Sequence, residues 1–278
     1  MKTLLTIASL LMSTALLLVG HGMQLTLLPL RGADNGLSAS LIGVSASCYF
    51  LGFLVGCFLV PKLISRVGHI RSFAVLTALT ASALLILDMV DYWGFWLVLR
   101  FLSGVTMSGL YALIESWLNT HTTEHNRGKV LAVYTFITLA SMAAGQIFVN
   151  AGPVESSTPF SLAVLFMALA IVPIGLTRKI APTPIESTSP SFRLLYQRSH
   201  SAFVGAILSG LVTGSFWSLG AVFASYYSDS LAGVSWFMMV AIGGGALFQY
   251  PIGWLSDRID RRWILILLSL GGALTAVA

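Results

Sequence analysis

The chain has 278 residues, of which 56% are hydrophobic and only 9% charged, and its formal net charge at pH 7 is +5. Soluble domains average about 45–50% apolar and about 25% charged residues. The composition therefore excludes a soluble globular protein and indicates an integral membrane protein.

Continuous apolar runs recur along the chain at the length of about 20 residues that crosses a bilayer as a helix. The runs do not alternate between apolar and polar residues, which favours an all-α membrane protein over a β-barrel. We expect eight complete spans, followed by a ninth that begins at Trp263 and stops at Ala278. The eight spans are 4–28, 41–61, 72–90, 95–117, 130–151, 158–176, 201–224 and 231–252.

The first span has one feature of a signal peptide, because Lys2 precedes an apolar stretch. No small-x-small cleavage site follows, and His21-Gly22-Met23-Gln24 leads directly into more apolar sequence. We therefore expect an uncleaved first helix.

The basic residues are distributed unequally between the two sides of the membrane. Thirteen of the 15 Lys and Arg residues fall in the loops of one side, whereas Arg31 alone falls on the other. The positive-inside rule then predicts a multi-pass membrane protein whose N-terminus lies in the cytoplasm. The lipid bilayer is the expected partner of these charges, and nucleic acid is not.

One span carries a polar stripe. Arg100, Gly104, Ser108, Tyr111 and Glu115 lie at spacings of 4, 4, 3 and 4, within about 80° of arc on a helix. An intramembrane Arg is costly against lipid, so we expect the stripe to face the bundle interior. Arg100 is a candidate for binding a substrate anion or for proton coupling, with a structural ion pair as the alternative. We interpret Glu115 as structural or gating.

Further polar residues lie within the spans. His21 and Gln24 belong to the first span and Gln146 to the fifth, and we predict that they line a substrate or proton pathway. An imidazole titrates near neutral pH, although a lone intramembrane His is more often a packing group. Trp217 and Gln249 are weaker cavity candidates.

Small residues at Gly52, Gly56 and the 243–245 glycine run suit close helix contacts. Packing is a sufficient explanation for all of them.

A metal centre is not expected. "HTTEH" at 121–125 matches the H-x-x-E-H zinc-peptidase pattern, in which His121 and His125 would bind zinc and Glu124 would activate water. The stretch is a short loop without the helix and third ligand that such a site needs. Cys48 and Cys57 fall on opposite faces of one helix, so they predict neither a disulfide nor a shared metal.

A weak internal repeat organises the chain. A shift of 192 residues places the loop at 65–69 over the loop at 257–261. We therefore expect a six-helix bundle at 1–176, a Pro- and Ser/Thr-rich cytoplasmic linker at 177–200, and a partial second bundle at 201–278. Two units of about 190 residues predict roughly 380 in all, so the chain is expected to be C-terminally incomplete.

The second of these loops carries a recognisable motif. Gly253-x-x-x-Asp257-Arg258-x-x-Arg261-Arg262 resembles the G-x-x-x-D-R-x-G-R-R loop signature of the major facilitator superfamily. The corresponding loop in the first half of the chain retains three residues of this signature, Arg66, Gly68 and Arg71.

Other segments resemble the same superfamily. Arg100-x-x-x-Gly104 is similar to its R-x-x-x-G element, and Glu115 followed by Arg127-Gly128 is similar to its acid-then-RG pattern. The stretches "LIESWLN", "NRGKVLAVY" and "GQIFVN" are similar to the YcaD-like bacterial branch.

The resemblance implies a secondary active transporter that moves a small-molecule substrate by alternating access, with protons as a candidate coupling ion. It implies no enzyme activity, no cofactor and no bound nucleotide, and no Walker loop is present. The loop residues would act as a gate, with Asp257 as a latch. Gly145-Gln146 stands where proton antiporters of the superfamily carry Gly-Pro. The alternatives are a membrane zinc peptidase at 121–125 and an inactive or scaffolding short form.

Overall fold

The structure is a computed structural model, and it describes residues 7–90, 92–123, 127–177, 196–228, 230–256 and 258–277. In these residues all the regular elements are α-helices, which confirms the predicted fold class. The helices are α2 (Ala8–Asp34), α3 (Ala39–Val67), α4 (His69–Met89), α5 (Trp93–Thr120), α6 (Arg127–Val149), α7 (Thr158–Leu169), α8 (Ile171–Gly175), α10 (His200–Ser225), α11 (Leu231–Ser256) and α12 (Arg261–Val277).

Eight helices in the described residues are long and apolar enough to cross a membrane, as the sequence predicted. α7 and α8 together make the span expected at 158–176. The largest differences are at the ends of α2 and α3. α2 runs to Asp34 rather than 28, and α3 runs to Val67 rather than 61, because Pro29 and Pro61 are accommodated inside the helices.

Short polar and glycine residues set the ends of several helices. The Ser38 hydroxyl accepts a hydrogen bond from the backbone N–H of Leu41 and caps the start of α3. Gly68 joins α3 to α4 at a φ of +85°, a left-handed value that favours glycine. The retained glycine of the first-half loop motif therefore makes a tight turn.

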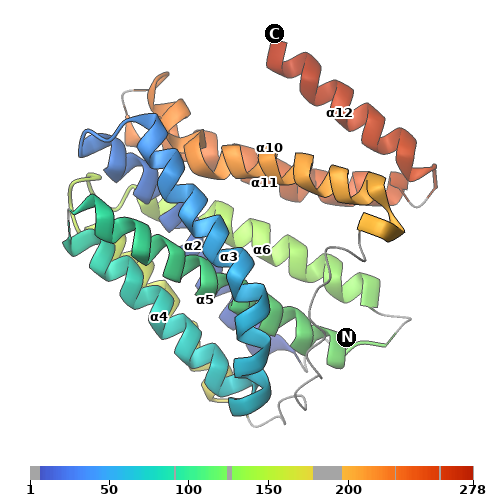
Figure 1. Cartoon of the computed structure of the whole chain (residues 1–278), viewed down its shortest axis with the longest axis horizontal. Helices are drawn as coiled ribbons and strands as arrows, with labels where there is room; N and C mark the ends of the chain where they lie inside the picture. Colours follow the sequence, from blue (N-terminus) through green and yellow to red (C-terminus); the bar gives the residue numbers. More distant parts are fainter. Residues whose placement is uncertain are drawn as a thin grey trace.

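α2 is the most enclosed of the spanning helices, and it packs against α6, α7 and α10 (Figure 1). Glycines allow these close contacts. A Cβ on Gly22 would lie 2.5 Å from the carbonyl oxygen of Met142 in α6, and one on Gly145 would lie 2.5 Å from that of Val19. The α2–α6 contact is therefore backbone against backbone.

α3 and α5 also approach closely. A Cβ on Gly52 would collide with the carbonyl oxygen of Phe101, and one on Gly104 would collide with that of Tyr49. One on Gly56 would lie 2.6 Å from the carbonyl oxygen of Val105. The expected packing role of Gly52 and Gly56 is confirmed.

α10 and α11 lie side by side, with α11 against α6 and α10 against α2 and α3, while α12 extends away from them (Figure 1). The expectation for the 243–245 glycine run is wrong in the described chain, because a Cβ on any of these glycines would meet nothing within 4 Å. The helix carries these glycines on faces that no described element covers.

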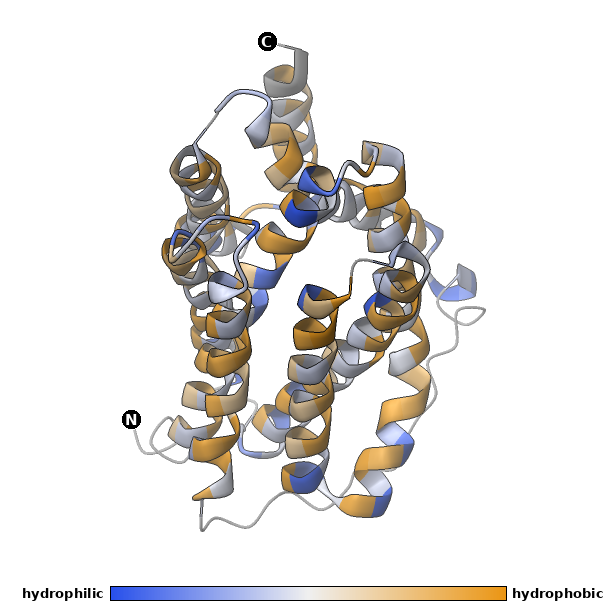
Figure 2. Ribbon diagram, turned by 90° about the vertical axis from the view of Figure 1, so that its left-hand side faces the viewer, coloured by the Kyte–Doolittle hydropathy of each residue, from blue (hydrophilic) through white to orange (hydrophobic). Residues whose placement is uncertain are grey.

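Most residues along the helices are hydrophobic (Figure 2). Large apolar side chains such as Leu54, Val98 and Leu211 are exposed, as lipid-facing residues of a multi-pass membrane protein are. Successive spans run in opposite directions. We call the side where α2 ends the Arg31 end, and the side where α6 begins the Lys129 end.

Candidate functional site

A cavity of about 290 Å³ lies near the middle of the bundle, where α2, α3, α5, α6 and α10 meet. Its lining is aromatic and apolar with a few polar atoms: His21, Leu25, Tyr49, Phe50, Phe53, Tyr111, Thr138, Leu139, Met142 and Trp217. This mixture of apolar walls and a few hydrogen-bonding groups is typical of small-molecule sites. His21, Tyr111 and Trp217 were predicted to line a cavity, and the structure brings them together.

Arg100 is buried directly behind this lining. Its guanidinium carbon lies 4.7 Å from the centroid of the Tyr49 ring, and its side chain is 5% exposed. Within the described part of the chain, its Nη1 atom has no hydrogen-bond partner and no carboxylate pairs with the guanidinium. The structural ion pair considered for Arg100 is therefore absent from the described residues, which leaves a buried positive charge uncompensated.

His21 and Gln24 lie one turn apart on α2, and both are buried. The His21 ring stacks on Tyr49 with centroids 6.2 Å apart. The Nδ1 atom of His21 and both amide atoms of Gln24 are buried without a hydrogen-bond partner of good geometry among the described residues. Unpaired buried polar atoms are costly, so this cluster has capacity to bind a ligand, a proton or water.

Gln146 has its hydrogen-bonding groups engaged between helices. Its Oε1 accepts a hydrogen bond from the Thr26 hydroxyl at 2.7 Å, and its Nε2 donates to the carbonyl oxygen of Gly22 at 2.9 Å. The side chain is 1% exposed, and it joins α6 to α2. It borders a smaller space of about 270 Å³ with Asn150 and Ser235 rather than the central cavity.

The predicted polar stripe of α5 faces the interior over most of its length. Gly104 packs on α3, and the Ser108 hydroxyl lies 3.3 Å from the Cys57 sulfur. Tyr111 reaches the central cavity. Glu115 is instead exposed, and in the described residues it forms no ion pair with Arg66, Arg71 or Arg127.

The loop-motif residues lie at the Lys129 end. Arg66 and Arg127 are exposed, and Gly68 makes the α3–α4 turn. Beyond Gly253, the Arg258 guanidinium lies 3.9 Å from the centroid of the Trp254 ring. Asp257 lies outside the described residues. The structure thus places the two loops of the motif at one end of the bundle.

The Arg31 end contains an interaction that sequence reasoning missed. Arg31 Nη2 lies 2.8 Å from Asp88 Oδ1, with the two side chains 12% and 2% exposed. Arg31 Nη1 donates to the carbonyl oxygen of Glu155 at 2.8 Å, and the guanidinium lies over the Phe160 ring. One side chain therefore ties α2 to α4 and to the α6–α7 loop.

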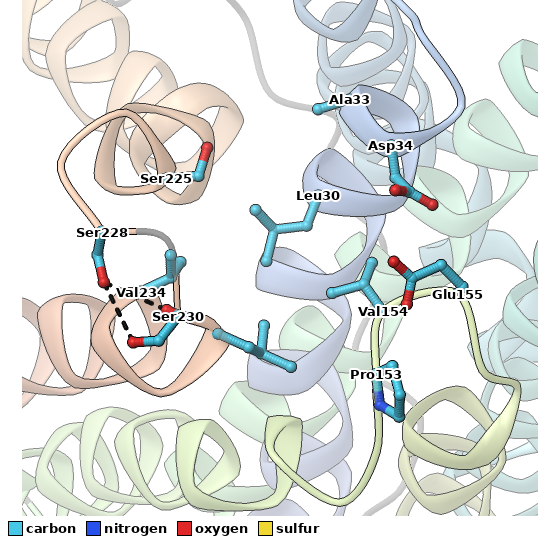
Figure 3. Close-up of a pocket in the computed structure, with 11 residues that line it drawn as sticks. Leu30, Ala33, Asp34, Pro153, Val154, Glu155, Ser225, Ser228, Ser230 and Val234 are labelled. Carbon is cyan, nitrogen blue, oxygen red and sulfur yellow. Dashed lines mark hydrogen bonds between the residues drawn. The ribbon is translucent and has the colours of Figure 1, made fainter.

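A wider space of about 400 Å³ lies at the same end (Figure 3). Asp34 and Glu155 border it on one side, with Ser225, Ser228 and Ser230 of the α10–α11 turn across from them (Figure 3). Asp34 is exposed, so we interpret this space as a mouth rather than a binding site.

The peptidase motif gains no support. The His121 Nδ1 atom lies 3.0 Å from the carbonyl oxygen of Trp117, while Glu124 and His125 lie outside the described residues. In the part of the chain that the structure describes, no group of three His, Cys, Asp or Glu residues lies close enough together to hold a metal ion.

The sequence profile described as Major Facilitator Superfamily matches residues 10–278. The chain belongs to the Major Facilitator Superfamily. Curated relatives include an uncharacterised MFS-type transporter of Enterobacter sp. (strain 638), which is 31% identical over 245 residues. The uncharacterised MFS-type transporter YcaD of Escherichia coli (strain K12 / DH10B) is 31% identical over 243 residues. Each alignment covers 86% of this chain and 63% of the relative, so the chain spans less than two thirds of their length.

Solved structures share the superfamily fold. The nucleoside transporter NupG aligns with a TM-score of 0.73 at 13% identity, covering 90% of this chain and 68% of that one. A D-xylose-proton symporter aligns with a TM-score of 0.64 at 14% identity, covering 92% and 70%. These structures support the fold, while the sequence profile and the 31% identical relatives confirm the family resemblance.

Proposed function

We propose that the protein is a secondary active transporter that moves a small organic solute across the bacterial inner membrane by alternating access. The observation that carries this is the 290 Å³ cavity at the meeting of five helices, with the buried Arg100 guanidinium, which no described carboxylate pairs, behind its Tyr49 wall. Membership of the superfamily and the MFS-type transporter names of its relatives support it.

In this proposal the Lys129 end faces the cytoplasm, as does the N-terminus, because the loops there hold most of the basic residues. The division into a bundle at 1–176, a linker at 177–200 and a second bundle beginning at 201 supplies the two bodies that move. The paired loops carrying Arg66, Gly68 and Arg258 form the cytoplasmic gate, together with Arg127 at the start of α6 and Glu115 near the end of α5.

The cavity chemistry favours an aromatic carboxylate as substrate. Tyr49, Phe53 and Tyr111 offer ring faces, and the described lining holds no carboxylate that would neutralise a cation. At a separation of roughly 8 Å and an effective dielectric constant of about 20, the charge of Arg100 contributes about 2 kcal/mol to binding of a monoanion. Protons are the proposed coupling ion, with His21 as the group that carries them.

Binding of three indole compounds tests this charge preference. We expect the purified protein to bind indole-3-acetate at least about 30-fold more tightly than tryptamine, with neutral indole-3-acetamide between them. In Arg100→Gln the difference between anion and cation should fall to within about threefold, because the charge that separates them is gone. Equilibrium dialysis with radiolabelled compounds measures all three constants.

Arg71→Gln is the matched control, since Arg71 is an exposed cation at the Lys129 end. It should keep the preference of the parent. Equal affinities for the three compounds in the parent, or a preference that survives Arg100→Gln, would exclude the role given to Arg100.

Alternating access itself is testable without a known substrate. In a Cys48→Ser/Cys57→Ser background, Thr138→Cys on the cavity wall should react with a membrane-impermeant methanethiosulfonate in both right-side-out and inside-out vesicles. The reason is that a transporter exposes its central site to each side in turn. Labelling is measured by mass spectrometry.

Ala83→Cys serves as the control, because Ala83 is 1% exposed within α4 and should react from neither side. If Thr138→Cys reacts in only one vesicle orientation, the cavity does not alternate and the proposed mechanism is wrong.

A further inference from the structure

A further space opens between α6 and α11 at the Lys129 end, with a volume of about 560 Å³. Its walls include Val133 and Phe136 from α6 and Trp254 from α11, and Lys129 stands at its α6 edge. None of the residues that line this groove lines the central cavity.

The groove lies on a different face of α6 from the central cavity. Lys129, Val133 and Phe136 recur at i, i+4 and i+7, so they form one stripe. Thr138 and Met142, which line the central cavity, lie roughly 160° around the helix from it. Phe136 is 53% and Trp254 48% exposed, so the groove has an open apolar side.

Two cations flank the apolar part. Lys129 is exposed at the first turn of α6, and the exposed Arg258 holds its guanidinium 3.9 Å from the Trp254 ring centroid. Neither makes an ion pair within the described residues. A groove that is apolar along its length and basic at one end complements an amphipathic anion.

We propose that this groove binds one anionic phospholipid from the bilayer. The phosphate lies between Lys129 and Arg258, and an acyl chain lies along Val133, Phe136 and Trp254. A free phosphate would leave the apolar wall unused, whereas a phospholipid meets both the charges and the apolar surface from within the bilayer.

Native mass spectrometry of the full chain tests the proposal, with dioleoylphosphatidylglycerol and dioleoylphosphatidylcholine added in equal amounts. We expect one phosphatidylglycerol to be retained at least fivefold more often than phosphatidylcholine. Lys129→Ala/Arg258→Ala should remove that preference. Lys62→Ala/Arg71→Ala, which deletes two exposed cations elsewhere at the same end, should keep it.

Two further arms distinguish a lipid seated in the groove from a headgroup held by charge alone. Phe136→Ser should weaken phosphatidylglycerol retention, since it removes apolar wall without changing charge. Glycerophosphoglycerol, the headgroup without acyl chains, should fail to displace the lipid. Equal loss in both double variants, or displacement by the headgroup alone, would overturn the proposal, and melting temperatures of all variants exclude unfolding as the cause.

Discussion

Gly104→Ala is expected to destabilise the protein by about 1–3 kcal/mol or more and to lower its melting temperature in detergent micelles. The new Cβ would collide with the carbonyl oxygen of Tyr49 and would lie 2.7 Å from the backbone nitrogen of Phe53. These atoms belong to the backbone of α3, so no rotamer change relieves the contact. α3 and α5 must move apart, which also shifts Tyr49 against Arg100.

Gly243→Ala is the matched control, because a Cβ at that helical glycine meets nothing within 4 Å. It should be neutral or stabilising by up to about 1 kcal/mol, the difference in helix propensity between the two residues. If Gly104→Ala has the same melting temperature as the parent protein, the backbones of α3 and α5 are not in contact.

Asp88→Ala is expected to cost about 3 kcal/mol of stability, because it leaves the largely buried guanidinium of Arg31 without its carboxylate. The second variant, Arg31→Met/Asp88→Ala, removes the orphaned charge and should recover at least half of that loss. Thermal unfolding of the single and double variants, combined as a double-mutant cycle, gives the coupling energy.

Asp34→Ala is the control for Asp88→Ala, because it also removes a carboxylate at the Arg31 end but from an exposed position. Its effect should stay within about 0.5 kcal/mol. If Arg31→Met and Asp88→Ala instead prove additive, the two side chains act independently and the Arg31 cluster does not tie α2 to α4.

The sequence predicted the spans well because hydropathy and length are local properties. The burial of Arg100 was also predictable, because a cation deep within an apolar run has to avoid lipid. His21 and Gln24 followed from the same reasoning, and the structure buries both, with His21 stacked on Tyr49.

What the sequence could not predict are pairings between distant helices. Arg31 and Asp88 are 57 positions apart, and Asp88 lies at the very end of its span, where nothing marks it as a partner. Gln146 was predicted to line a pathway, yet its amide is engaged by α2, which depends on a backbone approach that only Gly22 and Gly145 permit. The glycines at 243–245 were expected to pack against another helix, but no described helix lies within 4 Å of their Cβ positions. A small residue permits a close helix contact without showing that a neighbour is present.

Pro29, inside α2, has a consequence for the main chain of that helix. A proline has no N–H, so the carbonyl oxygen of Leu25, four residues earlier, lacks its usual helical donor. Leu25 is one of the residues that line the central cavity. This acceptor belongs to the main chain, so a substitution at position 25 changes the cavity wall but leaves the acceptor in place.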